Sequence, residues 1–425
     1  MSEQVPERWE KSSIDELLTP NCLFSDGDWV ESKDQDPNGT NRLIQLADIG
    51  DGKFLNKSNR FMNDEQFERL NCTELKQGDI LVARMPDPIG RASIFPKIHD
   101  RSATVVDVAV LRPTAVDNYW LMSVINSSEF RKGIEKNATG TTRTRIGRTA
   151  LSNITIHLPP LPEQKKIASI LTSVDEVIEK TQSQIDKLQD LKKGTMNELL
   201  TKGIGHTEFK DSELGRIPKS WEVVSVLDSN IAVLDGDRGN EYPKEKDFEK
   251  SGYCLFLSAK NVTKNGFRFN ETAFISKDKD EKLRKGRLNR NDVIITTRGT
   301  VGSIAQYDVK IPFDVVRINS GMAIIRNQEK KLSSDFLYHI LSSEVITQQI
   351  ENLTFGSAQP QLTIGTLNEL KLPIPQMSEQ LNIVHIFASI LKDIQNKKQK
   401  LHQTQSLKKS LMQDLLTGKV RVSVN

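Results

Sequence analysis

The sequence has few of the features that mark secreted, metal-binding or membrane-spanning proteins. Only three cysteines occur in 425 residues, and Cys22, Cys72 and Cys254 lie too far apart for a metal-ligand cluster. Such scarce thiols predict a reduced, cytoplasmic protein without a metal site. No run of about eighteen apolar residues is present, so we expect no membrane span. The polar segment Met1 to Glu10 predicts no signal peptide.

The net charge is small, and aromatic side chains are scarce as well. The formal net charge is only +3, and aromatic residues make up 6% of the chain. A nucleic-acid-binding domain often has a larger basic excess, so charge alone does not predict one. Charged residues reach 27% and hydrophobic residues 36%, which suits packed cores combined with long polar helices. The length allows two or three domains.

Motifs of catalysis are missing from the sequence. No Asn-Pro-Pro-aromatic motif and no glycine-rich cofactor loop of a methyltransferase occurs, and Gly299 to Ser303 lacks the lysine of a phosphate loop. Pro86-Asp87 could start a nuclease motif, but no Glu-x-Lys follows it at a convincing position on a strand. We find no pattern of nucleophile, base and orienting group. The sequence therefore predicts a non-catalytic protein that needs no cofactor.

The chain does contain a long internal repeat. Glu163-Gln164 recurs as Glu379-Gln380, 216 positions later, and the same shift without a gap joins Leu191-Lys192-Lys193 to Leu407-Lys408-Lys409. A match without gaps over about forty residues indicates one structural element that is used twice.

Shorter repeats precede each copy of this element. An apolar-Pro-x-x-Trp-Glu pattern ends at Trp9-Glu10 and again at Trp221-Glu222. A β-rich run leads from Gly78 to Arg84, and a similar run leads from Asn291 to Arg298. Gaps are needed between these blocks, so we expect two globular halves of one fold that differ in detail. The two tryptophans fit core anchors better than base-stacking residues.

Each copy of the long repeat is predicted to be a helix. Apolar residues recur at three-and-four spacing from Pro162 to about Lys202, and again from Ser378 to Thr417. Forty residues at about 1.5 Å each give a helix of about 60 Å. We expect the two helices to pack on each other as an antiparallel coiled coil; the alternative is that each packs only on its own globular half. The residues predicted to pair are Ile170, Val174, Ile178, Leu188, Leu191, Ile386, Ile390, Ile394, Leu401 and Leu407.

Taken together, these motifs resemble the specificity subunits of Type I restriction-modification systems. The resemblance rests on the Pro-x-x-Trp pattern, the two β-rich runs, and the segment Leu158 to Gln164 that recurs from Leu372 to Gln380. The run Gly356 to Leu362 is also similar to this family. The order of the motifs, twice over, covers essentially the whole chain.

The resemblance implies a mixed α+β fold with a pseudo-twofold internal repeat and four parts. The expected parts are a first target-recognition domain at 1–161, a first spacer helix at 162–204, a linker and second target-recognition domain at 205–377, and a second spacer helix with a C-terminal tail at 378–425. It also implies a bipartite double-stranded DNA target with an unread spacer, two methyltransferase subunits docked on the helices, and restriction subunits bound through them.

Two other interpretations of the chain stay open at this point. One is a coiled-coil adaptor that binds proteins rather than DNA, although an adaptor would not need two divergent globular halves. The other is the specificity subunit of a complex that only methylates.

Candidate DNA contacts are polar and basic residues in the expected loops, where Lys and Arg would bind phosphates and Arg, Asn, Gln or Thr would reach base edges. The structural alternative for each is an ordinary solvated side chain. In the first half the candidates are Arg84, Arg91, Lys97, Arg143, Arg145 and Arg148. In the second half they are Lys260, Asn261, Arg298, Thr300, Ser357, Gln359 and Gln361.

Overall fold

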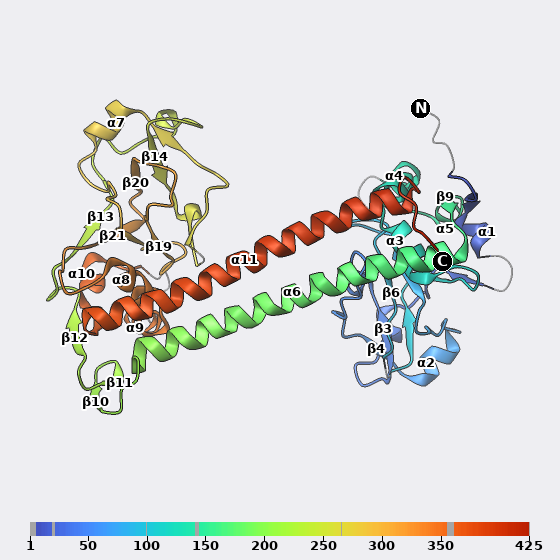
Figure 1. The fold of residues 1–425 in the computed structure, drawn as a ribbon, viewed down its shortest axis with the longest axis horizontal. Coiled ribbons are helices and arrows are strands. Elements are labelled where there is room, and N and C mark those ends of the chain that lie inside the picture. Colours follow the sequence, from blue (N-terminus) through green and yellow to red (C-terminus); the bar gives the residue numbers. More distant parts are fainter. Residues whose placement is uncertain are drawn as a thin grey trace. The chain divides into compact units, whose positions relative to one another are not determined.

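The protein folds into two compact units, each of which is described by itself. In the computed structural model, residues 6–18, 22–98, 100–140, 144–264, 266–354 and 361–424 are described. Unit 1 consists of Met1–Gln182 with Gln399–Asn425, and unit 2 is Ser183–Lys398. Two long helices, α6 (Leu161–Lys202) and α11 (Met377–Leu416), each contribute one half to each unit (Figure 1).

Unit 1 combines three small sheets with short helices. A four-stranded sheet has the order β2-β8-β5-β6, a three-stranded sheet has the order β4-β3-β7, and β1 pairs with β9. The strands are β1 (Glu10–Ser13), β2 (Leu23–Ser25), β3 (Asn41–Ile44), β4 (Phe61–Met62), β5 (Ile80–Ala83), β6 (Ala92–Ile94), β7 (Ser102–Thr104), β8 (Val108–Arg112) and β9 (Thr155–Leu158). The helices are α1 (Ile14–Leu17), α2 (Asp64–Arg69), α3 (Asn118–Ile125), α4 (Ser128–Asn137) and α5 (Arg148–Ser152).

Unit 2 repeats this plan. Its four-stranded sheet has the order β13-β21-β18-β19, its three-stranded sheet the order β17-β14-β20, and β12 pairs with β22. These strands are β12 (Glu222–Ser225), β13 (Ile231–Asp235), β14 (Cys254–Leu257), β17 (Phe274–Ile275), β18 (Val293–Thr296), β19 (Ile304–Gln306), β20 (Val316–Ile318), β21 (Met322–Asn327) and β22 (Lys371–Ile374). Two hairpins are added, β10 (Phe209–Ser212) with β11 (Gly215–Pro218) and β15 (Val262–Thr263) with β16 (Gly266–Phe267). The helices are α7 (Lys277–Lys282), α8 (Ser334–Leu341), α9 (Glu344–Thr354) and α10 (Ile364–Glu369).

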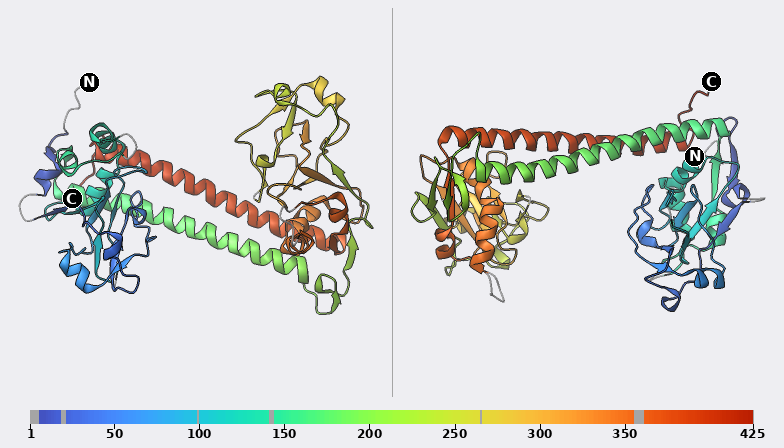
Figure 2. Two further views of the ribbon diagram at one scale, coloured as in Figure 1. Left: turned by 180° about the vertical axis from the view of Figure 1, so that it is seen from behind. Right: turned by 90° about the horizontal axis from the view of Figure 1, so that it is seen from below.

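The two units therefore share one topology, which confirms the predicted mixed α+β fold with an internal repeat. The agreement extends to strand direction, since β3 runs parallel to β7 as β14 runs parallel to β20. Figure 2 shows the strands and helices of each unit from two further sides.

The central strand of each four-stranded sheet is covered on both faces, as its unbroken apolar sequence requires. In β5, Ile80 and Val82 pack into the core that contains Trp120 of α3, whereas Leu81 and Ala83 pack into a separate core with Phe95. Successive side chains of a strand point to opposite faces, which explains this alternation. In β18, Val293 and Ile295 likewise face one core and Ile294 faces the other.

The repeated Trp and Glu-Gln motifs form matching anchors in the two units. The indole Nε1 of Trp9 donates to Glu163 at 3.0 Å, and that of Trp221 donates to Glu379 at 3.0 Å. Both tryptophans are buried, so the prediction of core anchors is confirmed.

The glutamine beside each of these glutamates ties the long helix to the sheet unit. Gln164 accepts a hydrogen bond from the backbone of Asp117, at the start of α3, at 2.9 Å. Gln380 accepts one from Ser333, at the start of α8, at 2.8 Å. The Glu-Gln pair is thus repeated because each copy joins a tryptophan and a helix start to the end of a long helix.

In each unit, parts of α6 and α11 run side by side in opposite directions and share a seam with a heptad spacing. On α6 the seam positions are 167, 171, 174, 178, 181, 185, 188, 192, 195 and 199, all of them buried or half-buried. On α11 they are 383, 387, 390, 394, 397, 401, 404, 408, 411 and 415, again buried or half-buried. Each α11 position is its α6 counterpart shifted by 216 residues.

Four of the ten predicted pairing residues do not belong to this seam. Leu191 is 54% exposed and Leu407 is 53% exposed, and they occupy the same repeat position. The sequence pattern pointed to the leucine, but the seam position is the next residue, Lys192 or Lys408, which is half-buried. Val174, Ile178, Leu188, Ile390, Ile394 and Leu401 lie in the seam, and Ile170 and Ile386 are half-buried beside it.

Candidate nucleic-acid interface

Both units contain an equivalent Arg–Asp ion pair in the four-stranded sheet. In each, the arginine lies on one strand and the aspartate lies in the turn just before the neighbouring strand. The guanidinium of Arg112 donates to both carboxylate oxygens of Asp79, at 2.6 and 2.7 Å. In unit 2, Arg326 donates to Asp292 at 2.9 and 2.7 Å. Each aspartate directly precedes a buried strand, β5 or β18. The two strands are therefore held in equivalent positions, and so are the starts of the loops that follow them.

Backbone hydrogen bonds align these two loops residue by residue. Arg84 N donates to Asp107 O and Thr297 N to Gly321 O, each at 2.8 Å. Ile146 N donates to Arg84 O at 3.1 Å, and Leu362 N donates to Thr297 O at 3.0 Å. Arg84 is therefore the counterpart of Thr297, not of Arg298. The two arginines to which the β-rich runs lead therefore do not occupy equivalent positions.

A shift of one residue sends a side chain to the other side of an extended chain, and the burial of the two arginines shows this. Arg84 is 1% exposed and forms an ion pair with Asp26 at 2.9 Å. Burial lowers the pKa of its guanidinium, and the negative charge of Asp26 opposes that effect. Arg298, by contrast, is exposed.

Two more of the predicted DNA contacts have their polar groups occupied inside the protein. Arg91 is 8% exposed and donates to four backbone carbonyls, those of Leu46, Ile49, Met85 and Pro88. Asn261 is 3% exposed, accepts from the backbone N–H of Ser258, and donates to the carbonyls of Arg268 and Glu271. These contacts give Arg91 and Asn261 internal partners, and Arg84 is held by Asp26 although its Nε is buried without a hydrogen-bond partner. Burial with internal partners favours a structural role for the three side chains.

The other candidates of unit 2 that the structure describes lie on its surface. Arg298 and Gln361 face each other: with the amide oxygen turned toward the guanidinium, Gln361 accepts from two nitrogens of Arg298, Nη2 at 3.0 Å and Nε at 3.2 Å. Thr300 is exposed in the same loop. Lys260 is exposed and forms an ion pair with Glu271 at 3.0 Å.

In unit 1 two of the accessible candidates, Arg145 and Arg148, lie at the start of α5 and in the loop before it. Arg145 forms an ion pair with Asp107 at 3.0 Å and remains partly exposed. Arg148, which is exposed, lies with its guanidinium 5.0 Å from the ring centre of Phe24. Lys97 is exposed on a separate segment. Arg143, Ser357 and Gln359 lie outside the described residues.

Comparisons with known proteins agree on one family. The model of the Type I restriction modification DNA specificity domain matches residues 6–190 and again residues 218–404. The chain belongs to the Type I restriction modification DNA specificity family.

Individual members of the family resemble the chain over its whole length. It is 32% identical to the Type I restriction enzyme MjaVIII specificity subunit of Methanocaldococcus jannaschii, over 99% of this chain and 94% of that one. The fold is similar to that of a Type-I restriction-modification system S subunit from M. genitalium, with a TM-score of 0.55, 16% identity and 96% of each chain covered. A chain from a structural study of the assembly and conformational transition of a type I R-M system is similar at a TM-score of 0.62 and 16% identity, over 98% of this chain and all of that one.

One repeated feature of this specificity-family chain escaped the sequence analysis. Asp26-Gly27-Asp28 follows β2, and Asp235-Gly236-Asp237 stands at the end of β13. The pairing of β2 with β8 and of β13 with β21 makes the two triplets equivalent. A Cβ on the central glycine would lie 2.4 Å from the Val105 carbonyl in unit 1 and 2.2 Å from the Asn319 carbonyl in unit 2. Only glycine permits this approach, and the repeated triplet was the available signal.

The triplet also supplies acidic groups to the same sheet end. Asp26 binds Arg84, and Asp235 binds Arg238 at 3.1 Å. Burial raises the pKa of Asp28, although hydrogen bonds from Thr73 oppose it.

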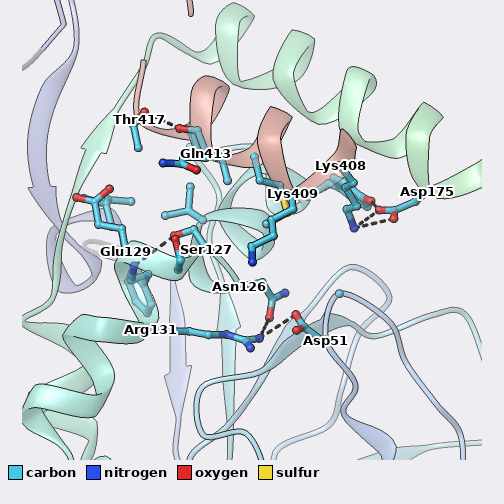
Figure 3. A pocket seen from close by; sticks show the side chains of 18 of the residues that line it. Asp51, Asn126, Ser127, Glu129, Arg131, Asp175, Lys408, Lys409, Gln413 and Thr417 are labelled. Carbon is cyan, nitrogen blue, oxygen red and sulfur yellow. Dashed lines mark hydrogen bonds and ion pairs between the residues drawn. The ribbon is translucent and has the colours of Figure 1, made fainter. Parts of the chain in front are cut away.

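A cavity of about 1520 Å³ lies elsewhere in unit 1, between α4, β9 and the two long helices. Lys409 points into it in Figure 3, between the Asp175–Lys408 ion pair and the pair of Arg131 with Asp51. Its lining carries both signs of charge, and none of the predicted DNA contacts that the structure describes is part of it.

Among the residues that the structure describes, no group of three or more His, Cys, Asp or Glu side chains could hold a metal ion. Within the same described ranges, no helix is long and apolar enough to cross a membrane.

Proposed function

We propose that the chain is the DNA-reading, non-catalytic subunit of a Type I restriction-modification complex. In this proposal each unit reads one short half of a bipartite double-stranded DNA target, and the bases between the halves are not read. The long helices dock two copies of a methyltransferase subunit, and restriction subunits join the complex through them. Modification and cleavage then belong to the partners.

The observation that carries the proposal is where the two units differ. The sheets, the Asp–Arg ion pairs and the Trp–Glu anchors coincide, but the residues that follow β5 and β18, and those that lie beside them, do not. Met85 stands where unit 2 has Arg298, and Arg145 stands where unit 2 has Gln361. Two units with the same fold but different polar side chains at equivalent positions fit the recognition of two different DNA sequences. Base pairs are distinguished by the hydrogen-bond pattern of their edges.

The repeated residues on the two long helices favour two docking sites for one kind of partner. Leu191 and Leu407 are large, exposed and apolar at the same repeat position, and a lysine follows each one in the seam. A partner that binds one of these segments would find the same residues in the other.

The length of the helices also suits a bipartite target. The 42 residues of α6 rise about 1.5 Å each, and this length exceeds the roughly 34–36 Å between sites one DNA turn apart.

A map of methylated bases tests the proposal. The chain is co-expressed with a methyltransferase subunit of a Type I system, and the modified adenines in the host DNA are located by long-read sequencing. We expect one motif of two short halves separated by unread positions. A continuous motif would contradict the proposal, as would the absence of methylation with every methyltransferase subunit tested.

A domain exchange tests the two-reader model. Replacement of residues 1–157 by the corresponding segment of another family member should change one half of the motif and leave the other unchanged. A change in both halves would overturn the model.

Omission of a restriction subunit from the same cells separates methylation from cleavage, since methylation alone should persist.

A further inference from the structure

We propose that Arg298 reads a guanine in the half-site of unit 2 and that Gln361 is the positioning residue that holds its guanidinium for this purpose. The inference rests on the proposed DNA-reading function and adds to it the chemistry of one contact. It concerns the loop at 297–302, between β18 and β19, and the segment that enters α10.

The loop that carries Arg298 is tightly held. Gly302 N donates to the carbonyl of Thr296 at 2.9 Å, and the Thr296 hydroxyl binds both ends of the turn, at Thr300 O and at Ser303 N. Gly299 and Gly302 have φ values of +73° and +83°, which favour glycine. A closed turn of this kind limits where the base of the Arg298 side chain can go.

Gln361 lies next to Arg298 because the backbone places it there. Leu362 N donates to Thr297 O at 3.0 Å, so the residues before Leu362 and after Thr297 are neighbours. With its amide oxygen turned toward the guanidinium, Gln361 accepts from Nε and Nη2 of Arg298. A guanidinium has five N–H donors, and this contact uses two of them. Both donors of Nη1 and one of Nη2 remain, and they form the end-on edge that matches the O6 and N7 acceptors of guanine.

The charge of Arg298 is also left uncompensated within the described part of the chain. No carboxylate there lies within ion-pair distance of it, whereas Arg84, Arg145, Arg238 and Arg326 each have an aspartate. A neutral amide orients the guanidinium and leaves its positive charge available to DNA. Unit 1 has no arginine at this place, since Met85 stands there and Arg145 is paired with Asp107.

The experiment compares methylation by complexes of the full chain with its methyltransferase subunits. Once the wild-type motif is mapped, duplexes with each base at every position of the second half-site are methylated in competition. Arg298→Lys keeps the charge but loses the two-donor edge, so preference for guanine at one position should fall by about 5- to 150-fold. Gln361→Leu should weaken the same preference at the same position, and by less.

Arg216→Lys is the matched control, because Arg216 is exposed on β11 of the same unit and lies over Phe209 at 5.5 Å. It should leave the motif unchanged. An unchanged second half-site in Arg298→Lys would overturn the inference, as would an equal loss at all positions or a change in the first half. A wild-type complex without any bipartite motif would instead refute the proposed function, so the two failures are distinguishable.

Discussion

Lys408 of α11 forms an ion pair with Asp175 of α6 inside unit 1, at 2.6 and 2.8 Å, and both side chains are largely shielded from solvent. The hydroxyl of Tyr119 also donates to Asp175, and burial together with this hydrogen bond raises the pKa of the tyrosine. Under the shift of 216 residues, the equivalent positions in unit 2 are Lys192 and Leu391. Unit 2 thus keeps the seam lysine and lacks its carboxylate.

Removal of Asp175 should therefore destabilise unit 1. Asp175→Leu leaves the Lys408 ammonium in the seam without its counter-ion, and we expect a loss of about 1–3 kcal/mol in the free energy of unfolding. Lys408→Met combined with Asp175→Leu should recover most of this loss, since it replaces both charges by apolar groups. Urea unfolding, with hydrogen exchange to localise the effect to unit 1, measures both. Equal stability of the single variant and the wild type would contradict the interpretation.

The reverse change should stabilise unit 2. Burial and the neighbouring Lys398 lower the pKa of Lys192, which shows that the folded protein disfavours its charge. Leu391→Asp would supply the carboxylate that unit 1 has at position 175, and Leu391 is already 38% exposed. We expect a gain of about 0.5–1 kcal/mol in the free energy of unfolding. Leu391→Asn, which has similar shape without the charge, is the control and should give no gain.

The helices and the anchoring residues around the site were predictable from the sequence. The burial and the partners of the polar side chains in the site were not. The 216-residue repeat identified the two long helices, and the separate Pro-x-x-Trp repeat identified the tryptophans as core anchors, because similar residues repeat where similar contacts are made. The strand ends could not be aligned by residue type. Two arginines near equivalent strands suggested one role, yet the hydrogen bonds at Asp107 and Gly321 place Arg84 one residue earlier and inside the protein. Burial of polar residues such as Arg91 and Asn261 depends on distant backbone carbonyls, which no local pattern reveals.

His339 should make the stability of unit 2 depend on pH. It lies on α8, 7% exposed, with its ring 4.8 Å from that of Phe387. Burial and the charge of Lys192 lower its pKa to about 4, although Asp335 opposes the shift. The folded state therefore keeps His339 neutral, while the unfolded chain takes up a proton below about pH 6.5. Stability is complete above that pH and is lost as the pH falls toward 4.

Between pH 7 and pH 5 this effect should lower the free energy of unfolding by about 2 kcal/mol. His339→Leu should remove that part of the pH dependence, as read from hydrogen exchange of the α8 amides at the two pH values. His402→Gln changes an exposed histidine of α11 and should leave the dependence intact. A pH profile of His339→Leu that follows the wild type would show that another group is responsible.

The exposed leucines of the two helices should each contribute to the docking of one methyltransferase subunit. Leu191→Asp and Leu407→Asp place a charge at the same repeat position of α6 and α11, where the side chains are 54% and 53% exposed. Because neither residue lies in the seam, the fold should be preserved, with a change in stability of no more than about 0.5 kcal/mol. A charge in an apolar contact should weaken binding by about 2 kcal/mol or more, which is roughly 30-fold.

Native mass spectrometry of the complex measures the outcome as a number of bound subunits. We expect two methyltransferase subunits on the wild type, one on either single variant, and none on the double variant at a concentration that just saturates the wild type. Lys180→Asp, at an exposed position of α6 outside the seam, controls for the effect of a new charge. Loss of both subunits from a single variant would show that the two docking sites are coupled, and full occupancy of the double variant would show that the partner binds elsewhere.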